Sequence, residues 1–278
     1  MGNKTVLITG CSSGFGKLAT KTFHRNGWNV VATMRAPEKE AELTATENML
    51  ITKLDVTDEQ SIHSAITHAM EKFGRIDALI NNAGYGGYGL FEQFDHADIS
   101  KMFDTNVFGP MRVTKAVLPI MRQQHSGAII NITSTAALTG LPCTSVYCAS
   151  KFAITGWSEG LRIECKPFNI KVKTILPGAF GTHFSAATDN RLNAGDDQVS
   201  QLANGILAHF TKLQAARRQQ EQKPADPQDV ADMIYMCVTE DTPTHNLVGK
   251  DAVLVADMKN SMPHQAFLDL MTATLLPE

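Results

Sequence analysis

Short apolar runs recur along this chain, and longer amphipathic segments separate them. A short apolar run bounded by turn residues predicts a buried strand, and apolar positions at helical spacing predict a helix. The alternation of the two predicts an α/β fold built on a largely parallel sheet. The predicted strands are Lys4–Thr9, Trp28–Thr33, Ile51–Leu54, Ile76–Ile80, Ala128–Thr133, Ile170–Leu176 and Ala252–Ala256.

The segments between these runs predict helices with recognisable ends. Asp58 is a suitable N-cap, and Asn169 tolerates the left-handed conformation that closes a helix. Pro110 lies inside the longest predicted helix, where it removes the N–H that would bond to the carbonyl of Asn106. We infer that this carbonyl is free to hold a water of a proton relay; the alternative is a simple kink. The predicted helices span about 17–25, 59–73, 97–124, 147–166 and 227–239, with a short amphipathic helix from Pro263.

A glycine-rich turn, Gly10-Cys-Ser-Ser-Gly14-Phe-Gly16, links the first predicted strand to the first helix. A second strand follows, and this βαβ arrangement is typical of dinucleotide binding. Gly10 permits the tight turn, Gly14 lets backbone approach a pyrophosphate, and Gly16 lets the helix lie close to the sheet. The helix N-terminus offers free N–H groups to the phosphates. The turn residues predicted to bind the cofactor are Gly10, Ser12, Ser13, Gly14, Phe15 and Gly16.

The end of the second predicted strand chooses between the two nicotinamide cofactors. A carboxylate there would bind the adenosine ribose and repel a 2′-phosphate. The chain has Thr33-Met-Arg35 instead, and the Arg35 guanidinium can bind a phosphate. The sequence therefore favours NADP(H) over NAD, although Arg35 could also be a solvated loop residue. Asp55 and Val56, after the third predicted strand, are expected on the adenine side.

Tyr147 and Lys151 are four residues apart, so a helix places them on one face. A nearby ammonium favours the phenolate and is expected to lower the tyrosine pKa toward the working range, which suits proton transfer to or from an oxygen. Such a pair alone is more often a surface coincidence. The run from 126 to 150 carries no charged residue, which fits a buried strand followed by a dry pocket wall.

Composition excludes several other classes of protein. The 278 residues carry a net charge of −3, which gives no electrostatic case for nucleic acid or an anionic membrane. No run is long and apolar enough for a transmembrane helix. The five scattered cysteines predict free thiols in a reducing compartment, hence a cytoplasmic protein, and no histidine or cysteine spacing suits a metal. The length predicts one domain, 1–278, in which the polar insertion 179–226 is a substrate lid.

Taken together, these motifs resemble the short-chain dehydrogenase/reductase family over essentially the whole chain, and loosely its hydroxysteroid- and retinol-dehydrogenase-like branch. The resemblance rests on order and spacing rather than on any one motif. The residues that carry it are Thr9 to Gly16, Asn81-Asn82-Ala83-Gly84, Asn106, Ser134, Tyr147-Cys-Ala-Ser-Lys151 and Pro177-Gly178.

The resemblance implies a Rossmann fold, a doubly wound seven-stranded parallel sheet with helices on both faces. It also implies a catalytic tetrad of Asn106, Ser134, Tyr147 and Lys151. Tyr147 would donate the proton, Ser134 would hold the substrate oxygen, and Lys151 would lower the tyrosine pKa and bind the nicotinamide ribose. The implied contacts around the nicotinamide are Asn82, Ala83, Gly84, Tyr147, Lys151, Pro177, Gly178 and Thr182.

The favoured function is an NADP(H)-dependent carbonyl reductase or secondary-alcohol dehydrogenase for an apolar ketone or alcohol. The expected pocket residues are Tyr85, Leu141, Cys143, Ala179 and Phe180, several of which could simply pack the core. The alternatives are an NAD-dependent alcohol dehydrogenase and a catalytically silent dinucleotide sensor. A homodimer or homotetramer is a family expectation. The chain departs from the family pattern after its last predicted strand, where Asp257-Met258 replaces an Asp-Gly-Gly ending.

Overall fold

The computed structural model describes residues 2–181, 188–220 and 225–277. Its centre is a seven-stranded parallel sheet in the order β3-β2-β1-β4-β6-β7-β9, as the sequence predicts for a Rossmann fold. The strands are β1 (Thr5–Thr9), β2 (Asn29–Met34), β3 (Met49–Lys53), β4 (Ala78–Asn81), β6 (Gly127–Ile132), β7 (Ile170–Pro177) and β9 (His245–Val248). A separate parallel pair joins β5 (Gly87–Tyr88) to β8 (Asp189–Asn190).

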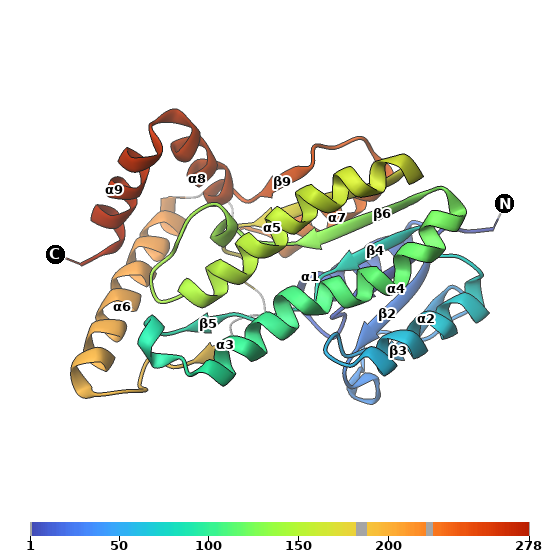
Figure 1. Cartoon of the computed structure of the whole chain (residues 1–278), viewed down its shortest axis with the longest axis horizontal. Coiled ribbons are helices and arrows are strands. Elements are labelled where there is room, and N and C mark those ends of the chain that lie inside the picture. Colours follow the sequence, from blue (N-terminus) through green and yellow to red (C-terminus); the bar gives the residue numbers. More distant parts are fainter. Residues whose placement is uncertain (1, 182–187, 221–224, 278) are drawn as a thin grey trace.

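Helices cover both faces of the sheet (Figure 1). The helices are α1 (Gly14–Arg25), α2 (Glu59–Phe73), α3 (His96–Phe103), α4 (Gly109–Gln124), α5 (Ser145–Cys165), α6 (Asp197–Gln220), α7 (Pro227–Thr239), α8 (Lys250–Ser261) and α9 (His264–Leu275). Single turns are η1 (Pro37–Lys39), η2 (Phe91–Gln93), η3 (Asp104–Phe108), η4 (Thr135–Ala137) and η5 (Lys166–Phe168). Helices α1 and α7 pack on one face, and α2, α4 and α5 pack on the other.

The alternation of side chains along the strands creates two apolar layers. In β1, Val6 and Ile8 face α1 and α7, whereas Leu7 faces α2, α4 and α5. Phe23 is fully buried between the rings of Trp28 and Tyr235, at centroid distances of 5.2 and 5.1 Å. Each such large side chain contributes about 2–3 kcal/mol by burial. This packing holds the strand ends that carry the polar residues described below.

Two predicted helix ends are confirmed. Asp58 caps α2, since its carboxylate accepts the N–H groups of Gln60 (2.9 Å) and Ser61 (3.3 Å). Asn169 closes the turn after α5 with a φ of 55°. The sequence was sufficient to predict these two helix ends, because each depends only on residues a few positions away in the chain.

The seventh predicted strand was wrong. The run Ala252–Ala256 lies inside α8, and the seventh strand of the sheet is His245–Val248. Gly249 has a φ of 101°, which ends the strand and turns the chain into the helix. Ala252 and Ala256 are buried while Val253 and Leu254 are exposed, which is a helical period rather than that of a buried strand. A short apolar run does not distinguish the two structures.

The long predicted helix is interrupted. Between α3 and α4, the η3 segment forms a π-helical turn in which the Gly109 N–H bonds to the carbonyl of Asp104, five residues earlier. Pro110 follows in the first turn of α4 and has no N–H to donate to the carbonyl of Asn106, four residues earlier. The interruption expected at Pro110 therefore takes the form of a π-bulge, a feature often found at functional sites.

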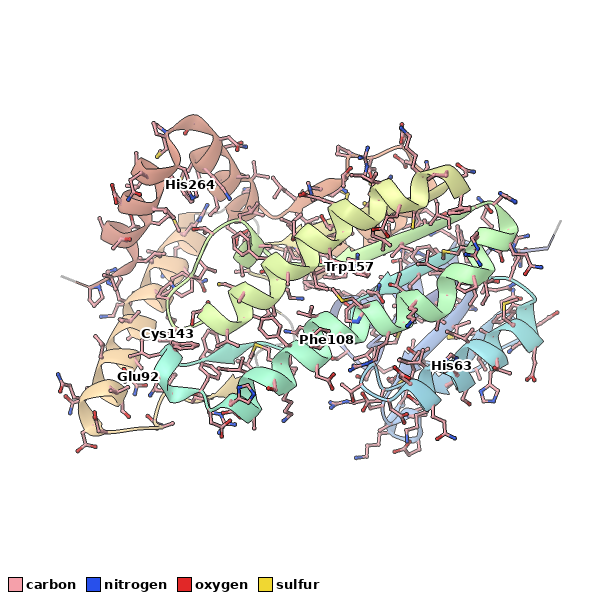
Figure 2. All side chains as sticks on the ribbon, viewed as in Figure 1. His63, Glu92, Phe108, Cys143, Trp157 and His264 are labelled. Carbon is pink, nitrogen blue, oxygen red and sulfur yellow. The ribbon has the colours of Figure 1, made fainter. Side chains whose placement is uncertain are left out.

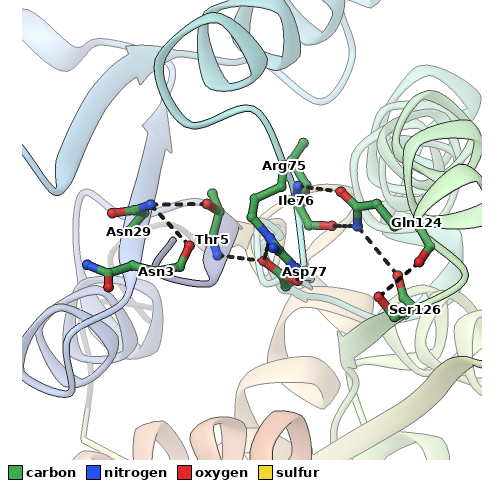
Figure 3. A network of polar contacts seen from close by, with 8 residues as sticks. All are labelled: Asn3, Thr5, Asn29, Arg75, Ile76, Asp77, Gln124 and Ser126. Carbon is green, nitrogen blue, oxygen red and sulfur yellow. Dashed lines mark hydrogen bonds and ion pairs between the residues drawn. The ribbon is translucent and has the colours of Figure 1, made fainter. Parts of the chain in front are cut away.

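A polar network ties the amino ends of the strands together (Figure 3). The Asp77 carboxylate accepts two hydrogen bonds from the Arg75 guanidinium and one from the N–H of Thr5 (2.8 Å). The Gln124 amide pairs with both backbone groups of Ile76, at 3.1 and 2.8 Å. This edge of the sheet is closed by side chains, whereas the carboxyl ends face α6, α8 and α9 (Figure 1).

In the described ranges, no helix is long and apolar enough to cross a bilayer, and no cluster of three or more metal-ligand residues occurs. All five cysteines are buried free thiols.

Candidate active site

The glycine turn closes tightly on the end of β4. Gly10 and Gly14 have φ angles of 74° and 54°. A Cβ on Gly16 would collide with the carbonyl oxygen of Gly10 and lie 2.5 Å from the Asn82 amide nitrogen. The Asn82 amide in turn donates to the carbonyls of Thr9 (2.9 Å) and Gly10 (3.1 Å). No side chain fits at Gly16, and one at Gly10 would crowd Asn82 and Ala83, so the backbone of this cradle is bare at these two positions and the residues present fit a dinucleotide.

The first turn of α1 completes the cradle. Ser12 and Ser13 are exposed, and the Ser13 side chain forms no cap hydrogen bond. The first turn carries no acidic residue, so its N–H groups and positive end remain available to an anion. Phe15 packs edge-on against Phe180 at 5.7 Å, which connects the turn to the loop after β7.

The loop after β2 brings both signs of charge to the adenosine end. Arg35 is exposed and takes part in no ion pair among the described residues. Glu40 folds back onto α1 and pairs with Lys17 at 3.2 Å, and Glu42 pairs with Lys17 at 3.0 Å. Burial raises the pKa of Cys11 to about 12, and the Glu40 charge adds to this rise, which shows that the carboxylate lies near the turn. Glu40 is not predictable from the residues at the strand end, because only the loop conformation brings it to the glycine turn.

The two residues predicted on the adenine side have different surroundings. Asp55 is half-buried, and its carboxylate accepts the N–H (2.9 Å) and hydroxyl (2.8 Å) of Thr57. Val56 is buried against Gly109, where a Cβ would lie 2.7 Å from its methyl group. Val56 therefore also joins the cofactor side to the π-helical turn.

The two asparagines at the end of β4, Asn81 and Asn82, have different contacts. Asn81 is buried and donates to Asn131 (2.8 Å) and Thr114 (3.0 Å), which ties β4 to β6 and α4. Asn82 faces the glycine turn as described above. Ala83 donates its N–H to the Thr9 hydroxyl (3.1 Å), so the whole 81–84 segment is fixed beside the turn.

Asn106 holds the loop after β4 against α5. Its side-chain oxygen accepts the Tyr85 N–H (3.0 Å), and its amide donates to the Tyr85 carbonyl (2.8 Å) and to Ser150 (3.3 Å). Ser150 donates to the Tyr147 carbonyl at 2.7 Å. Ser150 was missed because a small hydroxyl within a helix carries no distinctive signal. Gly84 lies close by, since a Cβ there would be 3.0 Å from Asn106 and 3.8 Å from the Lys151 ammonium.

Ser134, Tyr147 and Lys151 meet at the start of α5. Ser134 and Tyr147 share a side-chain hydrogen bond, and the Ser134 hydroxyl accepts the Ala136 N–H at 3.1 Å. The Lys151 ammonium lies 5.6 Å from the centroid of the Tyr147 ring and donates to the carbonyl of Ile132 at 3.0 Å. All four members of the expected tetrad thus lie in one connected region.

The pKa values reverse one expectation. Burial raises the pKa of Tyr147 above its ordinary value, and the hydrogen bond with Ser134 only partly opposes this. Burial also lowers the pKa of Lys151 from 10.5 to about 8. The expected fall in the tyrosine pKa was wrong for the protein alone, because removal of the phenolate from water outweighs the hydrogen bond with Ser134. Tyr147 is therefore a protonated phenol at neutral pH.

The expected pocket residues lie in the segments that follow β4, β6 and β7. Leu141, Ala179 and Phe180 are half-buried. Tyr85 is also half-buried, and it packs with Tyr147 and Met102 while its hydroxyl is enclosed. Cys143 is buried against α6 and donates to the Ala203 carbonyl (3.6 Å), at the point that Figure 2 labels. Pro177 is buried at the end of β7 and Gly178 follows it, whereas Thr182 lies outside the described residues.

The fold is of the Rossmann class, and the glycine turn fits a dinucleotide. The model of the short chain dehydrogenase family matches residues 4–193. An uncharacterized oxidoreductase from Bacillus subtilis, YusZ, is 37% identical over 99% of both chains. Retinol dehydrogenase 8 from Bos taurus is 34% identical over 84% of this chain and 78% of that protein.

Two solved structures extend the comparison. A short-chain dehydrogenase from Streptomyces avermitilis has a TM-score of 0.79 at 33% identity, covering 98% of this chain and 94% of that one. The NADP-bound structure of ElxO has a TM-score of 0.74 at 29% identity, covering 91% of this chain and 99% of that one. The chain belongs to the short-chain dehydrogenase/reductase family and is an oxidoreductase.

Proposed function

We propose that this protein transfers hydride between NADP(H) and an apolar ketone or alcohol, as a carbonyl reductase or secondary-alcohol dehydrogenase. The observation that carries the proposal is the hydrogen-bonded Ser134–Tyr147 pair beside the buried ammonium of Lys151. The catalytic residues in this proposal are Asn106, Ser134, Tyr147 and Lys151.

In the direction of reduction, the bound cofactor supplies a hydride to the carbonyl carbon. The hydroxyl of Ser134 holds the carbonyl oxygen and stabilises its developing negative charge. Tyr147, which burial keeps protonated in the protein alone, donates its proton to that oxygen, and this completes the alcohol. Lys151 stabilises the phenolate that remains. Asn106 keeps Tyr85 and Ser150 in place, and its carbonyl, which cannot receive an N–H from Pro110, orders the relay water.

The proposed cofactor site follows the cradle from one end to the other. Gly10, Ser12, Ser13, Gly14, Phe15 and Gly16 would hold the pyrophosphate, with Asp55 and Val56 on the adenine side. Asn82, Ala83, Gly84, Tyr147, Lys151, Pro177, Gly178 and Thr182 would surround the nicotinamide. Arg35 would bind the 2′-phosphate, and its exposure without an ion pair supports this. The Glu40 carboxylate near the turn favours NAD, the second candidate, although Lys17 neutralises it.

The proposed substrate is apolar. The half-buried apolar side chains of Leu141, Ala179 and Phe180 support this, with Tyr85 beside Tyr147 and Cys143 behind them. The relation to a retinol dehydrogenase is consistent with a bulky substrate. We treat the chain as one domain with 179–226 as the cover of the pocket, since Leu192, Ala203 and Ile206 of this insertion pack on Cys143. The buried free thiols support a cytoplasmic protein.

The proposed assembly is a homodimer or homotetramer paired through α4 and α5. A groove of about 430 Å³ runs between these helices and includes Leu118, Trp157 and Phe168. Figure 2 labels Trp157 and Phe108, which lie on this side of the molecule. Ile163, on α5, is 70% exposed, and Phe108, in the η3 turn before α4, is 50% exposed. Apolar exposure of this extent is typical of a contact surface.

The test is consumption of NADPH against a panel of ketones and aldehydes, with NADH in parallel. We expect turnover with NADPH that nearly vanishes in Tyr147→Phe while cofactor binding survives. Tyr235→Phe is the matched control, because Tyr235 packs on Phe23 in the core and should keep full activity. Tight binding without turnover across the panel would favour a dinucleotide sensor.

Cofactor choice is tested separately by measuring the Kd for NADPH and NADH. Arg35→Ala should weaken NADPH and leave NADH unchanged, and Glu40→Gln should weaken NADH selectively. Arg25→Ala, at the other end of α1, is the control. Equal affinities of the unaltered protein for both cofactors would refute the role of Arg35.

A further inference from the structure

Helix α8 lies beyond the residues that the family model matches, yet it contacts both sides of the candidate site. Asp251, in its first turn, reaches the loop after β7. Lys259, in its last turn, reaches the loop after β6. The loop after β7 carries Gly178 of the proposed nicotinamide contacts and also Ala179 and Phe180 of the proposed substrate contacts. The loop after β6 carries the proposed substrate contacts Leu141 and Cys143.

The Asp251 carboxylate is enclosed by two glycines. One oxygen accepts the N–H of Ala179 at 2.6 Å. The other lies where a Cβ on Gly178 would be, so no side chain fits at that position. A Cβ on Gly249 would lie 2.7 Å from the same oxygen. The carboxylate is therefore a specific seat for the 178–179 backbone, and the N-terminal end of α8 further favours its negative charge.

The sheet explains why this seat is needed. Pro177 pairs with Val248, and the Gly178 N–H donates to the Val248 carbonyl at 2.8 Å. Directly after this pair β9 turns away at Gly249, so the ladder between β7 and β9 ends here. The Asp251 carboxylate then accepts the N–H of the following residue, Ala179. The direction of the backbone immediately after Gly178 thus depends on a side chain rather than on the ladder.

Lys259 makes the corresponding contact on the other side. Its ammonium donates to the Leu138 carbonyl at 2.6 Å and lies 5.9 Å from the centroid of the Phe152 ring. Phe152 follows Lys151 in α5, and Leu138 lies four residues after Ser134. The ammonium therefore links the 135–144 loop to the helix that carries Tyr147 and Lys151.

We propose that α8 positions both walls of the active site, Asp251 setting the Gly178–Ala179 backbone against the nicotinamide and Lys259 setting the 135–144 loop against the substrate. Both are positioning residues, since each acts through the loop it holds. The proposal rests on the proposed cofactor and substrate sites. It assigns α8, which lies outside the glycine turn and the tetrad, a part in binding the reacting groups.

The first test separates the two halves of the cofactor. We would measure the Kd of NADPH and of 2′,5′-ADP, which lacks the nicotinamide, for the unaltered protein, Asp251→Ala and Asp251→Asn. A lost hydrogen bond to a charged group predicts about tenfold weaker NADPH binding in Asp251→Ala. Binding of 2′,5′-ADP should not change, and Asp251→Asn should recover most of the loss because its amide oxygen can accept the same N–H. Lys250→Met, on the exposed neighbour, is the control.

Equal weakening of NADPH and 2′,5′-ADP in Asp251→Ala, or no weakening of either, would overturn the role of Asp251. If Asp251→Ala does not fold, the comparison of Asp251→Asn with Lys250→Met decides, since the amide should still weaken NADPH relative to that control. The same measurement with NADH and 5′-AMP keeps the test valid should the protein prefer NAD. Because it needs no substrate, it also stands if turnover is never found.

Lys259→Met provides the second arm. It should leave both Kd values unchanged and raise the KM for the substrate several-fold, while kcat falls less. A loss of NADPH affinity in this variant, or an unchanged KM, would refute separate control of the two walls. Near-ultraviolet circular dichroism establishes that each variant keeps its tertiary packing.

Discussion

Substitution of Lys151 by Met should stabilise the fold while it abolishes activity. Lys151 is 6% exposed, and burial lowers its pKa from 10.5 to about 8. At neutral pH its ammonium is therefore held in the folded protein at a cost. The ammonium donates a hydrogen bond to the Ile132 carbonyl. This bond only partly compensates for the hydration that the charged group loses on burial.

The size of this cost follows from the two pKa values. Between pH 8 and 10.5 the unfolded chain binds this proton more tightly than the folded protein, so stability rises with pH. The whole change is about 3 kcal/mol, at 1.36 kcal/mol for each pH unit between the two values. Below pH 8 the full cost is present. Methionine removes it and forfeits a hydrogen bond worth about 1 kcal/mol, so the variant should gain about 2 kcal/mol at pH 7.

Urea unfolding at pH 7 and near pH 10.5 measures the prediction. Lys151→Met should be the more stable protein at pH 7, and this advantage should disappear or reverse near pH 10.5, where the unaltered lysine is neutral. Turnover should nearly vanish at both. A variant that is less stable by the same amount at both pH values would refute the reasoning, because Lys151 would then be an ordinary packing residue.

Lys173→Met is the matched control. Lys173 is also buried, and burial lowers its pKa, but it donates to the Glu240 carbonyl and the Thr242 hydroxyl at the far side of β7. This variant should change stability while activity is retained. Loss of turnover in it would mean that any buried lysine in the sheet affects catalysis indirectly.

Three further predictions follow from contacts of the described residues. Gly16→Ala should abolish dinucleotide binding, measured by calorimetry, because its methyl group would collide with the carbonyl of Gly10; unchanged affinity would contradict this. Asp77→Ala should lower the free energy of unfolding by about 1–3 kcal/mol, since the Thr5 N–H and a guanidinium lose their acceptor, and turnover at saturating substrate should stay the same. Ile163→Glu should shift the mass by light scattering toward a monomer, as its side chain is 70% exposed on α5; an unchanged assembly would exclude this face.

Local signals carried most of the fold prediction. Six of the seven predicted strands overlap strands of the sheet, because buried parallel strands read as continuous apolar runs. The seventh failed because His245–Val248 begins with polar residues, whereas the stronger apolar run after Gly249 is helical. The short β5–β8 pair was not predicted at all, since it joins residues far apart in the chain through only two pairs of residues.

The residues of the candidate site could be predicted where a short stretch of sequence by itself requires a given residue type. The glycine turn and the Tyr147–Lys151 spacing are of this kind. The pKa of Tyr147 was not, since its direction depends on how deeply the fold buries the phenol. The contact of Asp251 with Gly178 and Ala179 could not be predicted either, because it depends on where the last strand ends. Distant contacts decide both, and a sequence pattern does not contain them.

The positions of the two chain termini have a practical consequence for handling the protein. The chain enters β1 at Thr5, beside the closed network of the amino-terminal edge, whereas α9 ends against α6, where His209 contacts the Thr274 carbonyl at 3.1 Å (Figures 1 and 3). A fusion partner or surface tether joined before β1 would stand at the far end of the molecule from the chemistry. The same attachment after α9 would lie against α6, the helix that packs on Cys143. The two termini are therefore not equivalent as attachment points. Immobilisation through the amino terminus should leave the active site accessible to substrate.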